Sequence, residues 1–242
     1  MKKGIAWVLS LLLLLSGMSA YADGVLIMAT NPEFQPFEYM EGNQVVGFDV
    51  DLAMEIAKDL GLELQIEAMA FDAIIAAIEV GKADVGIAGM SITEERLKTV
   101  DFSVPYFNAT QICIVKAGSE IAEMEDLYGK LIGVQLGTTG DIAASELSDK
   151  IERYQKGLDA ILDLRGNKLD AVILDKPVAE SIVKALNDSS LILLESILFE
   201  DESYAIAIAQ HQPELLESIN NTIARIYEDG TIDTIISKYF GD

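Results

Sequence analysis

The sequence contains little of the chemistry that builds disulfides or metal centres, since its 242 residues include one cysteine and one histidine. A lone cysteine cannot form a disulfide within the chain, and Cys113 lies in an apolar run typical of a buried strand. His211 has no partner at metal-ligand spacing. We therefore expect neither a metal ion nor a cofactor.

Basic residues are also scarce, because 17 lysines and arginines stand against 40 acidic residues and give a formal net charge of −23 at pH 7. This balance argues against nucleic acid as a partner, since the phosphate backbone would be repelled. The acidic residues are scattered and form no long block, which favours a solvated surface that aids solubility. Attraction of cationic ligands is the alternative.

One long apolar run is present, at the N-terminus, and it is shorter than the roughly 20 residues that span a membrane. Lys2 and Lys3 precede the run at 5–15, and Ala20-Tyr21-Ala22 follows it as a small-residue cleavage pattern. These features predict a secretory signal peptide over residues 1–22, with a buried N-terminal helix as the alternative.

A lipid anchor would require a cysteine directly after Leu15-Ser16-Gly17, and Met18 occupies that position. Methionine has no thiol with which to form the thioether to a lipid. We therefore expect a mature chain that starts near Asp23, diffuses freely and is located in a periplasm.

Strand-like runs alternate with helical patterns along the chain, which predicts an α/β fold with mostly parallel sheets. The length and the 50% hydrophobic content allow two modest domains. A βαβαβ unit in the first half is repeated in the second and followed by two helices. Strands are predicted at 25–29, 62–67, 84–88, 131–135, 151–154, 171–174 and 204–209, and helices at 49–60, 71–81, 141–147, 160–165, 177–186, 213–227 and 232–239. Ligands in such folds bind beyond the carboxyl ends of strands, so residues just after strands are candidates for a site.

Four segments that follow predicted strands combine in a specific order and spacing, although no single one is diagnostic. They are 30–39 (TNPEFQPFEY) followed by 47–51 (GFDVD), 89–96 (GMSITEER), 101–106 (DFSVPY) and 133–140 (GVQLGTTG). Together they resemble the amino-acid-binding members of the periplasmic solute-binding protein family, the recognition components of ABC importers. The resemblance spans essentially the whole mature chain.

The resemblance implies the two-lobed type II periplasmic-binding-protein fold, in which each lobe has a mostly parallel sheet flanked by helices. Lobe 1 is expected to comprise residues 23–107 and 205–242, and lobe 2 residues 108–204. Two crossing hinge segments are expected around residues 106–110 and 202–204. Because each lobe alone offers only half of the contacts, the ligand would stabilise the closed form.

A zwitterionic amino acid needs an anion site, for which Arg96 is the natural partner because its planar fork donates two parallel hydrogen bonds. A surface ion pair of Arg96 with Glu94 or Asp101 is the alternative. Thr138 and Thr139 follow a strand and open a helix, where N–H groups and the Thr139 hydroxyl can point at a carboxylate. A simple helix cap is the alternative for this pair.

The same ligand needs a cation site, and Asp175 ends a predicted apolar strand where family members hold the ammonium group of the ligand. A helix cap before Pro177 is an equal alternative. Gly89 and Ser91 resemble the backbone and hydroxyl contacts to the ammonium and carboxylate groups. The resemblance thus assigns the carboxylate to Arg96 and Ser91, and the closing contacts to lobe 2.

The side chain of the ligand needs a pocket of its own. Phe34 and Phe71 correspond to the aromatic walls of this family, with core packing as the alternative for Phe71. Gln135 lies where many relatives also contact the ligand.

Asn31 stands where several relatives that bind basic ligands carry an aspartate, which weakens a basic ligand without excluding it. Glu33 or Glu38 could supply the missing negative charge. We rank arginine first, followed by glutamine, lysine and cystine.

These expectations predict a monomeric binding protein that clamps a free polar or basic L-amino acid and hands it to the membrane permease of an ABC importer, without changing it chemically. A lyase of the cyclohexadienyl-dehydratase type, which shares the fold, is the first alternative, with Glu33, Glu38 and Asp175 as formal acid–base candidates. A ligand-binding protein that docks onto a sensory receptor is the second.

Overall fold

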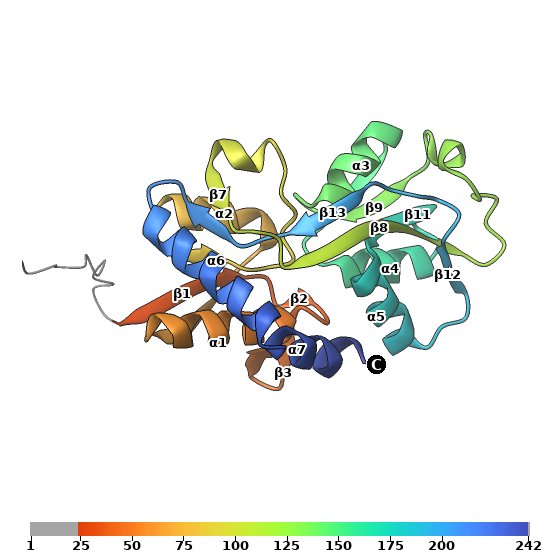
Figure 1. Cartoon of the computed structure of the whole chain (residues 1–242). Helices are drawn as coiled ribbons and strands as arrows, with labels where there is room; N and C mark the ends of the chain where they lie inside the picture. Colours follow the sequence, from red (N-terminus) through yellow and green to blue (C-terminus); the bar gives the residue numbers. More distant parts are fainter. Residues whose placement is uncertain (1–23, 242) are drawn as a thin grey trace, which may run out of the picture.

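The computed structural model describes residues 24–241, so the predicted signal peptide over residues 1–22 lies outside the described residues. Two lobes lie side by side, each built on its own β-sheet (Figure 1). The first lobe combines the red-to-yellow part of the chain with the blue C-terminal helices, and the second lobe is green to teal. Within residues 24–241, no helix is both long and apolar enough to cross a bilayer. The two-lobed α/β architecture confirms the predicted fold class.

The sheet of the first lobe has the strand order β5-β1-β6-β14-β7. β1 (Val25–Thr30) lies parallel to β5 (Glu63–Ala68) and to the two-residue β6 (Val85–Gly86). β14 (Ala207–Ala209) runs antiparallel to both β6 and β7 (Val100–Phe102). The predicted parallel unit is therefore extended by antiparallel strands, and the sheet is mixed.

Helix α1 (Phe48–Leu60) buries Leu52 and Ile56 against this sheet. It begins after Gly47, where a Cβ atom would lie 2.0 Å from the carbonyl oxygen of Phe37, so only glycine fits. It ends at Gly61, which takes the left-handed conformation typical of a helix C-terminus. The helix start at the GFDVD segment is thus fixed by close backbone packing.

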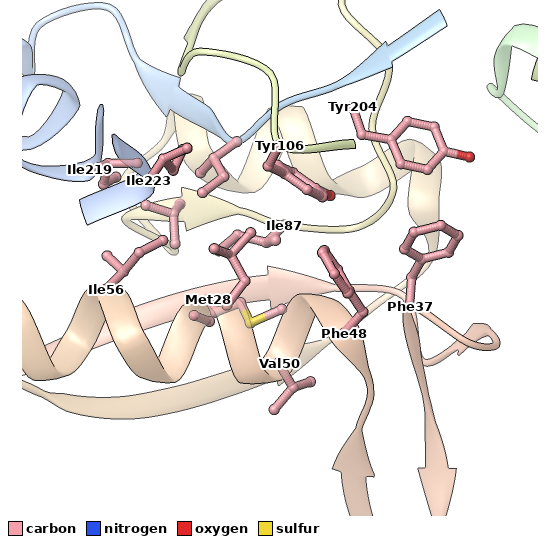
Figure 2. Packing of buried hydrophobic residues seen from close by; sticks show 14 of the residues in the cluster. Met28, Phe37, Phe48, Val50, Ile56, Ile87, Tyr106, Tyr204, Ile219 and Ile223 are labelled. Atoms are coloured by element: carbon pink, nitrogen blue, oxygen red, sulfur yellow. The ribbon is translucent and has the colours of Figure 1, made fainter. Parts of the chain in front are cut away.

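Three further helices complete the first lobe: α2 (Ile74–Glu79) after the 3-10 turn η1 (Phe71–Ala73), α6 (Pro213–Glu228) and α7 (Thr231–Phe240). Figure 2 shows Met28 from β1, Ile56 from α1, and Ile219 and Ile223 from α6 meeting in one core. The two ends of the chain therefore share a single hydrophobic core. This arrangement places the C-terminal helices in the first lobe.

The strand β7 of the first lobe was not predicted. Three further short strands were also not predicted: β2 (Glu33–Phe34), β3 (Glu38–Glu41) and β4 (Gln44–Val46), which form a separate antiparallel sheet. Their residues are partly polar and each strand is at most four residues long, so no period could be recognised. They present Phe34 to the interior, where its side chain is buried.

The sheet of the second lobe has the order β10-β9-β11-β8-β12. β9 (Ile132–Gln135) is parallel to β10 (Ile151–Tyr154) and β11 (Ala171–Asp175), whereas β8 (Phe107–Lys116) is antiparallel to β11 and β12 (Leu191–Leu194). This sheet is also mixed, because the strand that enters the lobe is antiparallel to its neighbours.

Both faces of this second sheet are covered by helices. On one face, Ile112 and Ile114 of β8 pack with α4 (Gly157–Arg165) and α5 (Lys176–Leu186). On the other face, Cys113 and Val115 pack in a cluster with Ala144 of α3 (Thr139–Leu147). Successive side chains of a strand point to opposite faces, so a strand buried on both sides reads as a continuous apolar run. The predicted burial of Cys113 is confirmed.

The chain crosses between the lobes along β8 and β13 (Asp201–Tyr204), which pair antiparallel over residues 107–110 and 201–204 (Figure 1). The single late strand predicted at 204–209 is wrong, because β13 ends at Tyr204 and β14 begins at Ala207. β13 pairs with β8, whereas β14 joins the first sheet. All side chains from 204 to 209 are buried, so the apolar pattern carries no sign of this break.

Candidate ligand-binding site

Eight of the ten predicted site residues line one small cavity between the two lobes, with an empty volume of about 190 Å³. The first lobe and the second lobe both contribute, and the lining residues are Phe34, Phe71, Gly89, Ser91, Arg96, Thr138, Thr139 and Asp175. These residues lie as far as 141 positions apart in the sequence. The fold therefore brings a guanidinium, a carboxylate, two aromatic rings and three hydroxyl groups to one place.

The positions of these residues follow from the ends of the strands. Gly89 and Ser91 come shortly after β6, and Asp175 is the last residue of β11. Thr138 lies between β9 and α3, and Thr139 is the first residue of α3. Each belongs to the carboxyl end of a strand in a parallel pair, where α/β sheets bind their ligands.

Arg96 lies in the 3-10 turn η2 (Arg96–Lys98) and is only 9% exposed. Its Nη1 donates to the carbonyl oxygen of Ser91 at 2.6 Å and its Nη2 to that of Gly137 at 3.0 Å, which joins the two lobes. The guanidinium carbon also lies 5.3 Å from the ring centroid of Phe71. The predicted alternative, a surface ion pair, is not what the structure contains.

The guanidinium is short of a counter-charge. Burial lowers the pKa of Arg96, and the negative charges of Asp175 and Glu202 oppose this shift. A guanidinium has five N–H donors, of which Arg96 uses two on backbone carbonyls. A buried cation in this condition gains strongly from an anion that takes the remaining donors.

Asp175 is 4% exposed and accepts a hydrogen bond from the hydroxyl of Tyr204. Burial raises the pKa of Asp175 to about 7, the charge of Glu202 adds to this shift, and the Tyr204 hydrogen bond opposes it. Asp175 occupies the N-cap position of α5, but its side chain makes no capping hydrogen bond. The side chain thus faces the cavity and not the helix.

The two threonines at the start of α3 have different surroundings. Thr138 caps the helix, because its Oγ1 accepts from the N–H of Asp141 at 3.3 Å and donates to the carbonyl of Gln135 at 2.8 Å. Thr139 Oγ1 donates to Glu202 Oε2 at 2.7 Å and accepts from Gln111 Nε2 at 3.2 Å. Both hydroxyls therefore already make hydrogen bonds within the protein.

Asn31 and Gln135 do not line the cavity with the other eight predicted residues. Gln135 Nε2 donates to Asn31 Oδ1 at 3.0 Å, and Asn31 Nδ2 donates to the carbonyl of Met69 at 2.8 Å. Both side chains are buried. They connect the lobes beside the cavity, so the amide of Asn31 is committed within the protein.

Two buried carboxyl groups, Glu38 and Asp49, lie behind the cavity and were not predicted as a pair. Asp49 Oδ2 accepts from the N–H of Gly89 at 2.8 Å and from the hydroxyl of Tyr106 at 2.9 Å. Burial raises the pKa of Asp49 to about 6, and burial together with the charge of Asp49 raises the pKa of Glu38 well above its usual value. Neither carboxyl oxygen of Glu38 has a hydrogen-bond partner within the described part of the chain.

Asp49 fixes the backbone of Gly89, which has φ +52, and a Cβ atom there would lie 2.5 Å from the ring of Phe34. Only glycine allows the chain to pass so close to this aromatic wall. Glu38 does not line the cavity. Glu33 forms an ion pair with Lys156 of the second lobe at 2.7 Å and also lies outside the cavity.

Comparison with known proteins shows a family to which this chain is similar. The sequence profile of the bacterial extracellular solute-binding proteins, family 3, matches residues 26–242. The arginine-binding extracellular protein ArtP of Bacillus subtilis is 34% identical over 219 residues, which cover 89% of this chain and 86% of ArtP.

Two solved structures share the fold over 90% of this chain. A mutant of ArgBP from T. maritima is 42% identical, with a TM-score of 0.84 and 96% of that chain covered. The ancestral amino acid-binding protein AncCDT-1, a precursor of cyclohexadienyl dehydratase, is 36% identical, with a TM-score of 0.82 and 96% covered.

Proposed function

Because the chain belongs to the bacterial extracellular solute-binding proteins of family 3, we propose that it captures a free L-amino acid between its lobes and presents it to the membrane permease of an ABC importer. The observation that carries this proposal is the pair of opposite buried charges, Arg96 and Asp175, which line one cavity from opposite lobes. The guanidinium can bind the carboxylate of a zwitterion, and the carboxylate of the protein can bind its ammonium group.

In this proposal the carboxylate of the ligand binds the remaining donors of Arg96 and the N–H groups at the start of α3. The ammonium group binds Asp175 and the oxygen of Ser91. Phe34 and Phe71 enclose the first part of the ligand side chain, since both rings line the cavity.

The lobes would move as units during this cycle. We place lobe 1 at residues 23–107 and 205–242, lobe 2 at 108–204, and the hinge at the paired segments 106–110 and 202–204. The pairing of β8 with β13 supports this hinge, because the chain passes between the lobes along these two strands and they pair at residues 107–110 and 201–204. A ligand that contacts both lobes favours the closed form by its differential affinity for it.

Arginine is the first candidate ligand, since ArtP is named an arginine-binding protein and a truncated form of ArgBP has been solved with arginine bound. Glutamine, lysine and cystine follow. The net charge of −23 gives a general attraction for a cationic solute. Glu33 and Lys156 already neutralise each other, so Glu33 is a weaker partner for a guanidinium than a free carboxylate would be.

The cellular setting follows from the family and from the N-terminal sequence. We propose that residues 1–22 direct export and are removed, and that the mature protein acts as a monomer in a periplasm. Its partner is then a permease of the inner membrane.

A lyase remains the second candidate because AncCDT-1 is a precursor of an enzyme. Of the three formal acid–base candidates, Glu33 is ion-paired and Glu38 is buried outside the cavity, so Asp175 is the one of the three that lines it. Incubation with prephenate-like acids and analysis of products separates the two functions, since turnover would favour the lyase.

The test of the binding function uses protein that has been unfolded and refolded to remove any bound ligand. A panel of proteinogenic L-amino acids and cystine is then screened by thermal unfolding. At a ligand concentration of about 100 times the dissociation constant, the stabilisation should be roughly 2.7 kcal/mol. No stabilisation by any member of the panel would refute the amino-acid assignment.

A further inference from the structure

Glu202 lies on β13 in the crossing region and contacts both lobes with one oxygen atom. Its Oε2 accepts a hydrogen bond from the hydroxyl of Ser91, in the first lobe, and from that of Thr139, in the second lobe, at 2.7 Å for Thr139. The backbone of Glu202 is held opposite Ala109 of β8, independently of either hydroxyl. The carboxylate therefore reaches into the site from a fixed strand.

These contacts decide which way the two hydroxyl protons point. A serine hydroxyl has one proton to donate and two lone pairs that accept. Since Ser91 gives its proton to Glu202, it can only accept a hydrogen bond from a ligand. Thr139 donates to Glu202 and accepts from Gln111, so its hydroxyl has no proton left to donate to a ligand and keeps one lone pair.

We propose that Glu202 is a positioning residue that orients the hydroxyl of Ser91 as an acceptor and so makes the site select for the α-ammonium group of its ligand. The inference rests on the proposed function and revises the predicted role of Ser91, which was assigned to the carboxylate. Without Glu202, the Ser91 proton is free to turn toward a ligand carboxylate or toward Asp175. The lone pairs of the Ser91 hydroxyl are then no longer held toward the ammonium group of the ligand.

This role is also tied to closure of the lobes. Ser91 and Thr139 belong to different lobes, so both reach the same oxygen of Glu202 only when the lobes are together. The orientation is therefore set in the form that encloses the ligand. Glu202 thus links the crossing region to the residues that bind the ligand.

A competing role can be distinguished, in which the Glu202 carboxylate occupies the place of the ligand carboxylate and must be displaced. Arg96 makes its two hydrogen bonds to carbonyl oxygens of Ser91 and Gly137 and none to Glu202. This geometry argues against displacement, because a mimic of the ligand carboxylate would bind the guanidinium. The two roles predict opposite changes in affinity when the carboxylate is removed.

The experiment measures the binding of L-arginine and of des-amino arginine, which lacks the α-amino group, to refolded mature protein by calorimetry. Glu202→Ala should weaken L-arginine binding roughly 10- to 100-fold, in the range of a hydrogen bond to a charged group, and change des-amino arginine binding less than about threefold. Glu202→Gln, which keeps the shape, should lie between Glu202→Ala and the wild type. Asp201→Ala, an exposed acid on the same strand, is the control and should match the wild type.

A double-mutant cycle tests whether Glu202 acts through Ser91. In the Ser91→Ala background, Glu202→Ala should cost less than about threefold further, because coupled residues are not additive. Additive losses, unchanged L-arginine affinity, or tighter binding in Glu202→Ala would each overturn the proposal. If the wild type binds neither L-arginine nor another member of the amino-acid panel, the proposed function fails and this role fails with it. If the wild type binds an amino acid but the Glu202 variants give one of these contradicting results, the positioning role alone is rejected.

Discussion

The two halves of the site are held in different ways. In the first lobe, the half-site is supported from within that lobe, since Arg96 is anchored on the Ser91 carbonyl and Asp49 holds the backbone of Gly89. In the second lobe, Asp175 and Thr139 are held by Tyr204 and Glu202, which lie on the crossing strand. The first half-site is therefore held largely from within its own lobe, with further contacts to Gly137 and Glu202, whereas the second is held from the crossing strand.

This difference suggests an order of binding. A ligand would dock on the first lobe through its carboxylate, and the second lobe would then close on its ammonium group. Removing a group of the first half-site should therefore abolish capture, whereas removing a group of the second should weaken closure. The following experiments are arranged from the largest expected effect to the smallest.

The largest effect is expected for Arg96→Ala, which removes the carboxylate partner. Amino-acid binding should weaken by roughly 2 to 5 kcal/mol, as for a buried charge that loses its partner. Titration calorimetry measures the loss. Arg165→Ala is the control, because Arg165 is a half-exposed arginine of the second lobe paired with Asp188 at 3.5 Å. Wild-type affinity in Arg96→Ala would refute the carboxylate role.

A smaller loss is expected for Asp175→Asn, which keeps a hydrogen-bond acceptor for Tyr204 but removes the charge. Binding should weaken by roughly 1.5 to 3 kcal/mol, the range of a hydrogen bond to a charged group. The matched control is Asp163→Asn, since Asp163 also accepts from a tyrosine, Tyr154, at 2.9 Å but lies away from the cavity. Equal losses in the two variants would contradict a specific role of Asp175.

The pH dependence tests the same group without mutation. Burial raises the pKa of Asp175 to about 7 in the ligand-free protein, and the ammonium group requires the charged form. Affinity should therefore fall as the pH decreases below about 7, by at most about tenfold per pH unit, and Asp175→Asn should lack this component.

The same pKa shift has the opposite consequence for the stability of the ligand-free protein. A carboxyl whose pKa is raised by folding contributes stability that is fully present below about pH 4 and is lost as the pH rises through 7. Chemical denaturation of ligand-free wild type and Asp175→Asn between pH 4 and 8 measures this contribution. If the free energy of unfolding of the wild type depends on pH in the same way as that of Asp175→Asn, the raised pKa of Asp175 is contradicted.

The smallest effect is expected for Lys156→Ala, which breaks the ion pair with Glu33 across the lobes. Both side chains are partly exposed, so the loss of ligand-binding free energy should stay below about 1 kcal/mol and should be smaller still in high salt. Lys168→Ala breaks a comparable pair with Asp163 inside the second lobe and should leave ligand binding unchanged. A large loss in Lys156→Ala would show that closure depends on this pair more than on the buried groups.

Local sequence patterns were sufficient for most of the regular elements. α1 was predicted at 49–60 and spans Phe48–Leu60, because an apolar stripe and a terminal glycine are local signals. The short strands β2 to β4, β7 and β12 and the break between β13 and β14 were missed. These features depend on which strand pairs with which, and that information lies outside any one window of sequence.

The sequence by itself determined the kind of chemistry present. The GMSITEER and GVQLGTTG segments and the acid at the end of the Ala171–Asp175 strand identified six residues that line one cavity, and Phe34 and Phe71 complete the eight. Only the tertiary structure decided how their protons and charges are arranged. Glu202 is 111 residues from Ser91, and Tyr204 is 29 residues from Asp175. Hydrogen-bond direction and burial arise from such distant neighbours, so they exist only after the chain has folded and the two lobes have met.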